Sequence, residues 1–330
     1  GSGGMNDLKH RILAAVSDDL DDIEKALVDN LNPYLDLVSE VAGHILFSGG
    51  KRLRPLLMVL SARICGYNGD YEKTFSTALE YLHAATLLHD DLVDEATLRR
   101  GKPVAHSKWG NSIAVLVGDY LLARALSISA ATGRLRVVQI LAGLTENMSQ
   151  GEVHQLMRKG DISLTEDEYK EVIRRKTAML FEAACRVSAI IADATEEQEK
   201  ALAEYGHNLG IAFQMADDLF DYTLQTSDFG KEVGADLREG KLTLPVIYAL
   251  QKAQPGDRDL MIKIIRDQDF SGTDFKFLTD LLEKYGGLTY TQNTAASYID
   301  TAKKALAVFD PSPTKDTMLD IAEYALARSI

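Results

Sequence analysis

The sequence predicts an all-α fold in which a single domain forms a bundle of ten or more helices. From Asp7 to about Arg328, apolar residues recur mostly at spacings of three and four, the period of an amphipathic helix. The chain contains 7 prolines in 330 residues, about 2% against an average of roughly 5%, which leaves room for long helices. No segment alternates between apolar and polar residues for long enough to require a sheet.

Clusters of turn-forming residues punctuate this pattern and mark loops between helices. These clusters are Gly66-Tyr67-Asn68-Gly69, Arg100-Gly101-Lys102-Pro103, Gly160-Asp161, Asp193-Ala194-Thr195 and Gln254-Pro255-Gly256-Asp257. No linker rich in Ser, Gly or Pro divides the chain, so we predict one domain over residues 5–330. We interpret Gly-Ser-Gly-Gly at residues 1–4 as a cloning remnant.

The first helical element with a clear start signal follows Ser17. Aspartates occupy positions 18, 19, 21 and 22, where acidic side chains suit the positive end of a helix dipole and a preceding serine suits the N-cap. This segment matches the pattern Asp-Asp-x-x-Asp, and we interpret it as helix capping and a solvated face. The next element is an apolar helix over 56–65, opened by residues 49–55.

Three further helical runs follow along the chain. One leads from Tyr81 into Asp90, and another leads from Leu209 into Asp217. Between them, the apolar stretch 112–128 is shorter than a bilayer span and is interrupted by Asp119 and Arg124. We therefore predict no integral membrane segment.

The charge balance excludes one class of partner. Thirty-six Lys and Arg against 49 Asp and Glu give a net charge of −13, whereas nucleic-acid binding is driven by clustered cations. Cys65 and Cys185 are far apart and form no Cys-x-x-Cys motif, so neither a disulfide framework nor a zinc site is indicated. We expect a cytoplasmic protein that binds no nucleic acid.

The pattern Asp-Asp-x-x-Asp recurs in two apolar settings, at Asp90-Asp91-Asp94 and at Asp217-Asp218-Asp221. The first and last aspartates of each cluster lie about 40° apart on one helix face. Carboxylates grouped in a partly buried place repel each other unless cations share them. Mg²⁺ suits such oxygen ligands and takes its remaining ligands from water and substrate phosphates.

Basic residues accompany both clusters. Arg99 and Arg100 follow the first, Lys231 and Lys241 follow the second, and Lys51, Arg52 and Arg54 precede the helix of the first. On a chain of negative net charge, acidic clusters trailed by cations indicate magnesium–diphosphate chemistry. His83 lies seven residues before Asp90, within about 20° of it on the same face, which favours contact with the same ligand.

Five motifs in this order resemble the trans-isoprenyl (polyprenyl) diphosphate synthases, most closely the long-chain octaprenyl-type branch. They are Gly49-Gly50-Lys51-Arg52-Leu53-Arg54-Pro55, Leu88-His89-Asp90-Asp91-Leu92-Val93-Asp94-Glu95-Ala96-Thr97-Leu98-Arg99-Arg100-Gly101, Arg175-Lys176-Thr177-Ala178, Phe213-Gln214-Met215-Ala216-Asp217-Asp218-Leu219-Phe220-Asp221 and Gly230-Lys231. The resemblance covers nearly all of the chain.

The resemblance implies an all-α domain, usually a homodimer, with a central active-site cavity and the two aspartate clusters across its mouth. It implies head-to-tail 1′-4 condensation of isopentenyl diphosphate onto an allylic diphosphate. By similarity, Asp90, Asp94 and Asp217, with Asp91, Asp218 and Asp221 supporting them, hold Mg²⁺ on the allylic diphosphate, with three ions expected. Arg99, Lys176 and Lys231 complete the allylic pocket; Lys51, Arg54, His83 and Arg100 hold isopentenyl diphosphate; Lys241 is a further substrate-binding candidate. Thr177, Gln214 and Phe213 line the position of the cation.

The helix before Asp90 predicts a long product. Thr86 and Ala85, four and five residues back, are small, and the resemblance implies that aromatic residues there mark shorter-chain members. Leu82, Leu79 and Phe75 continue the same face, with Phe75 roughly 22 Å from Asp90 at 1.5 Å per residue. Phe75 is the expected floor of the tunnel, although a residue of the 116–128 helix is an alternative.

Three other functions stay open at this stage. The first is a shorter-chain synthase that makes geranylgeranyl or farnesyl diphosphate. The second is a class I terpene cyclase, although the second motif here is all aspartate and Lys51, Arg54 and Arg100 supply an extra cationic site. The third is an inactive partner subunit, although both aspartate clusters are intact.

Overall fold

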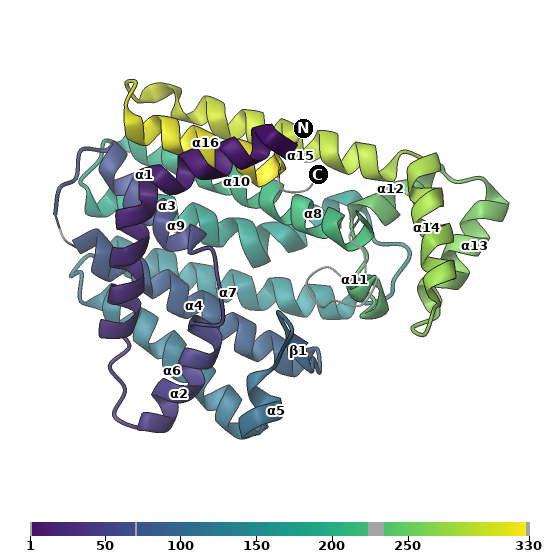
Figure 1. The fold of residues 1–330 in the computed structure, drawn as a ribbon, viewed down its shortest axis with the longest axis horizontal. Coiled ribbons are helices and arrows are strands. Elements are labelled where there is room, and N and C mark those ends of the chain that lie inside the picture. Colours follow the sequence, from purple (N-terminus) through teal and green to yellow (C-terminus); the bar gives the residue numbers. More distant parts are fainter. Residues whose placement is uncertain (1, 70, 224–233, 328–330) are drawn as a thin grey trace.

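The computed structural model describes residues 2–69, 71–223 and 234–327, and these form the predicted all-α bundle (Figure 1). The first half of the chain contains α1 (Ser2–Asp29), α2 (Asp36–Leu46), α3 (Leu53–Ile64), α4 (Tyr71–Val93), α5 (Ala105–Trp109), α6 (Asn111–Ala130) and α7 (Leu135–Met157). The second half contains α8 (Glu166–Ile173), the π-helical turn η1 (Arg174–Ala178), α9 (Met179–Ile191), α10 (Glu196–Thr223), α11 (Ala235–Arg238), α12 (Leu244–Lys252), α13 (Pro255–Arg266), α14 (Gly272–Lys284), α15 (Gly287–Ala305), the 3₁₀ turn η2 (Leu306–Val308) and α16 (Pro313–Ala327).

Helices α4 and α10 are the elements around which the others pack. Helix α4 packs mainly against α6 and α3, and α10 packs mainly against α9 and α15. One hydrophobic core extends from Ile12 on α1 to Ala325 on α16, and a second, smaller core joins the end of α10 to α11–α14. The α13–α14 pair projects from one end of the bundle (Figure 1). The prediction that residues 5–330 form a single domain stays a prediction.

A short β-hairpin follows α4. Strands β1 (Leu98–Arg99) and β2 (Lys102–Pro103) pair antiparallel, with Arg99 opposite Lys102. The two turn residues between them, Arg100 and Gly101, have φ angles of 51° and 75°, the positive values that tight hairpin turns require. The hairpin is too short to disturb the all-α class, but it fixes the place of two arginines.

The start of the first helix differs from the prediction. Helix α1 runs without a break through Ser17, so Ser17 is not an N-cap. The helix continues upstream because Ile12 and Val16 extend the buried face. Asp19 is also not solvated: it is 7% exposed and accepts hydrogen bonds from Arg63 at 2.6 and 3.0 Å. Residues 2–4, interpreted as a cloning remnant, lie within the same helix.

Helix α6 is longer than the sequence pattern suggested. At 20 residues it is long and apolar enough to cross a membrane by length and composition alone, and only 39% of its most apolar window is buried. It is nevertheless tied to the bundle by polar contacts. Tyr120 Oη donates to the Leu31 carbonyl at 2.5 Å, and Arg124 Nε donates to the Asn30 carbonyl at 2.6 Å. The same length and composition occur in core helices, so α6 is weak support for a membrane span.

Candidate active site

A cavity of about 960 Å³ lies between α4, α7 and α10 and brings together most of the predicted site. Its lining includes Lys51, Arg54, Leu82, His83, Ala85, Thr86, Asp90, Arg99, Arg100, Lys176, Thr177, Phe213, Gln214 and Asp217. One end is charged and the other is apolar. A substrate with a diphosphate head and a hydrocarbon tail fits this division.

The first aspartate cluster lies where α4 ends. Asp90 is on the last turn, and Asp94 follows the helix, with its backbone N–H donating to the Asp90 carbonyl at 2.8 Å. Glu95 has a φ of 54°, and the Ala96 N–H returns to the Asp91 carbonyl at 2.9 Å, which closes the helix in a left-handed cap. This ending leaves Asp94 exposed to solvent.

Asp91 has a different role from its neighbour. It is 6% exposed and accepts hydrogen bonds from Arg99 Nε at 2.9 Å and Arg99 Nη2 at 2.7 Å. This bidentate pair fastens the hairpin to α4 and orients Arg99, which lines the cavity. Asp91 therefore supports the site by holding Arg99 and is not itself among the residues that line the cavity.

A carboxylate that the sequence reading missed faces Asp90 from α7. Glu152 Oε2 lies 2.7 Å from Lys176 Nζ, and Lys176 Nζ also donates to Gln155 Oε1 at 3.0 Å. Burial raises the pKa of Asp90 to about 7, with repulsion from Glu152 and Asp94 adding to the effect and Lys176 opposing it. Partial desolvation and Glu152 also raise the pKa of Asp94. This end of the cavity therefore favours bound cations.

Lys176 and Thr177 reach the cavity from the π-helical turn η1. Such a turn holds one residue more than an α-helical turn and is often found at functional sites. Two glycines allow neighbouring helices to approach it closely. A Cβ at Gly151 on α7 would lie 2.9 Å from Lys176 Cγ, and a Cβ at Gly210 on α10 would lie 2.7 Å from Ala178 Cα.

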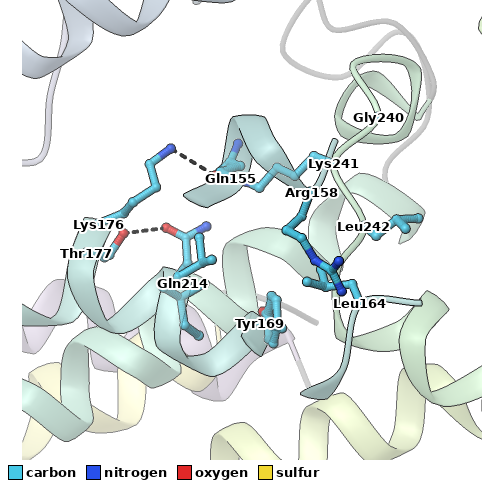
Figure 2. Close-up of a pocket in the computed structure, with 12 residues that line it drawn as sticks. Gln155, Arg158, Leu164, Tyr169, Lys176, Thr177, Gln214, Gly240, Lys241 and Leu242 are labelled. Carbon is cyan, nitrogen blue, oxygen red and sulfur yellow. Dashed lines mark hydrogen bonds between the residues drawn. The ribbon is translucent and has the colours of Figure 1, made fainter. Parts of the chain in front are cut away.

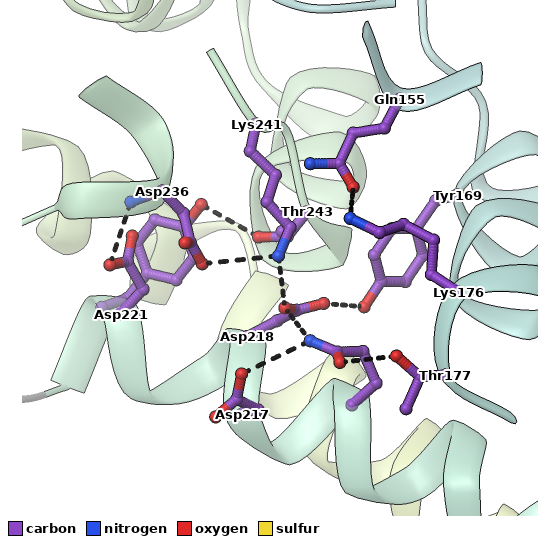
Figure 3. A network of polar contacts seen from close by, with 12 residues as sticks. Gln155, Tyr169, Lys176, Thr177, Asp217, Asp218, Asp221, Asp236, Lys241 and Thr243 are labelled. Carbon is purple, nitrogen blue, oxygen red and sulfur yellow. Dashed lines mark hydrogen bonds and ion pairs between the residues drawn. The ribbon is translucent and has the colours of Figure 1, made fainter. Parts of the chain in front are cut away.

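The carboxylates of the second aspartate cluster also differ from one another in their surroundings (Figure 3). Asp217 is exposed and lines the cavity, whereas Asp218 is fully buried. Asp218 accepts hydrogen bonds from Tyr169 Oη on α8 at 2.5 Å and from Gln214 Nε2 at 2.8 Å. Gln214 Oε1 in turn accepts from Thr177 Oγ1 at 3.0 Å. This chain of contacts connects the cavity wall to the core.

Burial raises the pKa of Asp218 to about 6, and Lys241 opposes this shift. Burial also raises the pKa of Tyr169 well above its usual range, so the phenol stays protonated and donates. Asp221 Oδ1 accepts from the Asp236 N–H at 3.3 Å and so positions the start of α11. Of the three predicted metal ligands on α10, only Asp217 lines the large cavity.

Lys241 lies beside a smaller pocket of about 50 Å³ (Figure 2). Its Nζ is 3.5 Å from Asp218 Oδ1 and 3.9 Å from Asp236 Oδ2. Burial lowers the pKa of Lys241, but Asp236, Asp218 and Asp217 outweigh that effect and raise it well above its usual range. Lys176, Thr177 and Gln214 line both pockets, so Lys241 is adjacent to the large cavity. Its substrate-binding role stays a prediction, and Lys231 lies outside the described residues.

The remaining cations gather at the other side of the charged end. Lys51 lies in the loop before α3, Arg54 is on the first turn of α3, and Arg100 comes from the hairpin turn. His83 lies among them. Burial and the positive charge of nearby guanidinium groups lower its pKa well below the usual range, so the ring is neutral; those groups belong to Arg54, Arg99, Arg100 and Arg52. A neutral imidazole donates one hydrogen bond to an anion without adding charge.

The apolar part of the lining includes residues from several helices. Ala85 and Leu82 come from α4, Leu122 from α6 and Met148 from α7. Within the described part of the chain, the α4 residues that line the cavity extend back to Leu82 and Glu80. Leu79 and Phe75 are fully buried in the main core beneath it. The role of Phe75 as the floor stays a prediction, and Leu122 is the lining residue from the alternative helix.

The carboxylates present fit a divalent cation shared with a ligand. Asp90 and Asp217 line one cavity, and Asp94 is close enough to the cavity residues Glu152 and Lys176 for their charges to affect its pKa. Among the described residues, no three His, Cys, Asp or Glu side chains are close enough to hold a metal alone. This is the donor set expected when diphosphate oxygens and water complete the coordination shell.

Comparison with known proteins shows which family the chain belongs to. The polyprenyl synthetase family model matches residues 35–282. The octaprenyl diphosphate synthase of Escherichia coli is 38% identical over 96% of this chain and 98% of its own. The chain belongs to the polyprenyl synthetase family. It is therefore a prenyl-transferring enzyme, and the predicted likeness to the octaprenyl-type branch is confirmed.

Two further family members extend the comparison. The all-trans-nonaprenyl-diphosphate synthase (geranyl-diphosphate specific) of Rhodobacter capsulatus is 36% identical, with 98% of each chain covered. A polyprenyl synthase structure from Caulobacter crescentus, complexed with calcium and isoprenyl diphosphate, superimposes with a TM-score of 0.91. It is 38% identical and covers 97% of this chain and 98% of that chain. The all-α prediction is confirmed by these polyprenyl synthetase relatives.

Proposed function

We propose that this enzyme condenses isopentenyl diphosphate head-to-tail, through 1′-4 bonds, onto an allylic diphosphate to make a long-chain all-trans polyprenyl diphosphate of the octaprenyl class. The observation that carries the proposal is the large cavity, which has cations and carboxylates at one end and apolar side chains at the other. The octaprenyl and nonaprenyl names of its relatives support the product class.

Magnesium is the proposed cofactor, and the number of ions expected from the family resemblance is three. Asp90, Asp94 and Asp217 are the residues that would hold it. When bound, magnesium supplies positive charge that stabilises the diphosphate as a leaving group. Asp91 and Asp218 support the site indirectly, because one orients Arg99 and the other anchors Gln214.

The cationic side chains divide between two diphosphates. Lys176 and Arg99, with Lys231, bind the allylic diphosphate. Lys51, Arg54 and Arg100, with neutral His83, bind isopentenyl diphosphate. Thr177, Gln214 and Phe213 face the position of the allylic cation, and the apolar wall excludes water that would quench it. The departing diphosphate accepts the proton that the new product cation loses.

The exposed face of α6 favours a homodimer. Val115, Leu116 and Leu126 are 39%, 61% and 38% exposed on that helix, an apolar surface that a second copy would cover. The hydrogen bonds from Tyr120 and Arg124 to the loop after α1 favour a protein partner over a bilayer. Light scattering of the purified chain should give twice the monomer mass. The proposed location is the cytoplasm.

Incubation with Mg²⁺, farnesyl diphosphate and isopentenyl diphosphate tests the activity. We expect elongated diphosphates, sized by reverse-phase chromatography after dephosphorylation, with chains longer than geranylgeranyl. A cyclised hydrocarbon would instead indicate a terpene cyclase. Products that stop at geranylgeranyl would indicate a short-chain synthase, and no turnover would indicate a partner subunit.

Kinetics of single variants test the division of cations. Lys51→Ala should raise the KM for isopentenyl diphosphate by about tenfold with little change in kcat, because it removes a contact to the unreacted substrate. Lys176→Ala or Lys231→Ala should mainly lower kcat, because these cations stabilise charge that develops as the allylic bond breaks. The same kinetic signature in all three variants would contradict the division.

A further inference from the structure

Arg52 stands between two predicted ligands, Lys51 and Arg54, but its surroundings differ from theirs. It precedes α3 with a φ of 54° and a ψ of 31°, in the left-handed region. A residue with a Cβ adopts that conformation at a cost of about 1–3 kcal/mol, and surrounding contacts must hold it there. Arg52 is 6% exposed although it borders the cavity.

The contacts that hold Arg52 come from three other elements. Its Nε and Nη2 donate to Glu24 on α1, at 2.5 and 3.2 Å. Nη2 also donates to the Leu46 carbonyl at the end of α2, at 2.5 Å. Nη1 lies 3.5 Å from Glu80 Oε1 on α4. One guanidinium therefore joins the start of α3 to α1, α2 and α4.

Carboxylates within the protein already pair with the positive charge of Arg52. Glu24 and Glu80 are both carboxylates, and Glu80 is 7% exposed with its Oε2 making no hydrogen bond within the described residues. Four of the five N–H groups of Arg52 already donate to these two carboxylates or to the Leu46 carbonyl, so one is left for a diphosphate. Arg52 is thus a poor direct ligand but a strong anchor.

We propose that Arg52 is a positioning residue that sets the affinity for isopentenyl diphosphate. Its pairing with Glu24 and Glu80 fixes the 48–52 loop, and so fixes the direction from which Lys51 and Arg54 approach the substrate. This inference rests on the proposed assignment of Lys51 and Arg54 to isopentenyl diphosphate. Its distinctive consequence is that Glu24, which is absent from the described cavity lining, affects substrate binding.

Steady-state kinetics of Arg52→Lys and Glu24→Gln test the proposal. Lysine keeps the charge but loses the planar fork that joins several acceptors, so Arg52→Lys should raise the KM for isopentenyl diphosphate about tenfold. Glu24→Gln should raise the same KM about fivefold, while kcat and the KM for farnesyl diphosphate stay within about twofold. The double variant should be no worse than Arg52→Lys, because the two changes break one contact.

Asp21→Asn is the matched control, since Asp21 is an exposed acid on the same helix, and it should behave as wild type. An unchanged KM in Glu24→Gln beside a raised KM in Arg52→Lys would make Arg52 a direct ligand and overturn the proposal. A lower melting temperature in both variants with unchanged KM values would overturn it too. Lys51→Ala is run in parallel: if its KM is unchanged, the binding-site assignment fails, and the proposal with it.

Discussion

Asp90→Ala and Asp217→Ala should each lower kcat by about 10³-fold while helical content stays at the wild-type level. Each variant removes a carboxylate that lines the charged end of the cavity, where it is proposed to hold a cation against the leaving diphosphate. Neither side chain is a packing element of the core, so the bundle should still form. Activity is measured with saturating substrates, and folding by circular dichroism.

Asp18→Ala provides a control within the same sequence pattern. Asp18 belongs to the third Asp-Asp-x-x-Asp match, is exposed on α1, and should be replaceable without loss of activity. Binding of Mn²⁺ in the presence of inorganic pyrophosphate gives a readout independent of turnover, and it should weaken in both active-site variants. Near-normal turnover in either one would show that the clusters are not the metal site.

Ala85→Tyr should give an active enzyme that releases shorter products. Ala85 lines the apolar end of the cavity one turn behind the charged end, and a tyrosine ring there would fill the space that the growing chain enters. The residues that face the diphosphates are untouched, so turnover should persist. The measurement is product length by reverse-phase chromatography, together with the melting temperature of the variant.

Two outcomes separate tunnel blockage from simple overpacking. Overpacking of the core predicts a lower melting temperature and an unchanged product distribution. Ala85→Ser, a change of similar size to the native residue, should leave both measurements unchanged. A stable, active Ala85→Tyr enzyme with wild-type products would remove Ala85 from the path of the chain.

The sequence predicted which residues gather at the cavity better than it predicted what each one contacts. Helical spacing places Asp90 and Asp94 near one face, and both are at the charged end. Adjacent residues on a helix point about 100° apart, so Asp91 turns toward Arg99 instead. The sequence could not reveal this, because the hairpin that supplies Arg99 is a tertiary feature.

Long-range contacts account for the other residues that were missed or misread. Tyr169 binds Asp218 across 49 positions of sequence, and Glu152 meets Lys176 from another helix. Neither residue lies in a motif that local pattern could detect. The error at Ser17 has the opposite origin: a strong local capping signal was overridden by the buried face that continues upstream.

The π-helical turn η1 supplies residues of the cavity wall without disturbing the packing of the helices on either side. Its surplus residue is absorbed within Arg174–Ala178, so α8 before it and α9 after it keep their own packing. Removing one residue from the turn would rotate one flanking helix by about 100° relative to the other. Exchanging a side chain within the turn would instead alter the cavity wall and leave both helices in register. Substitutions in this turn can therefore change the surface that meets the substrate while the packing of the bundle stays the same.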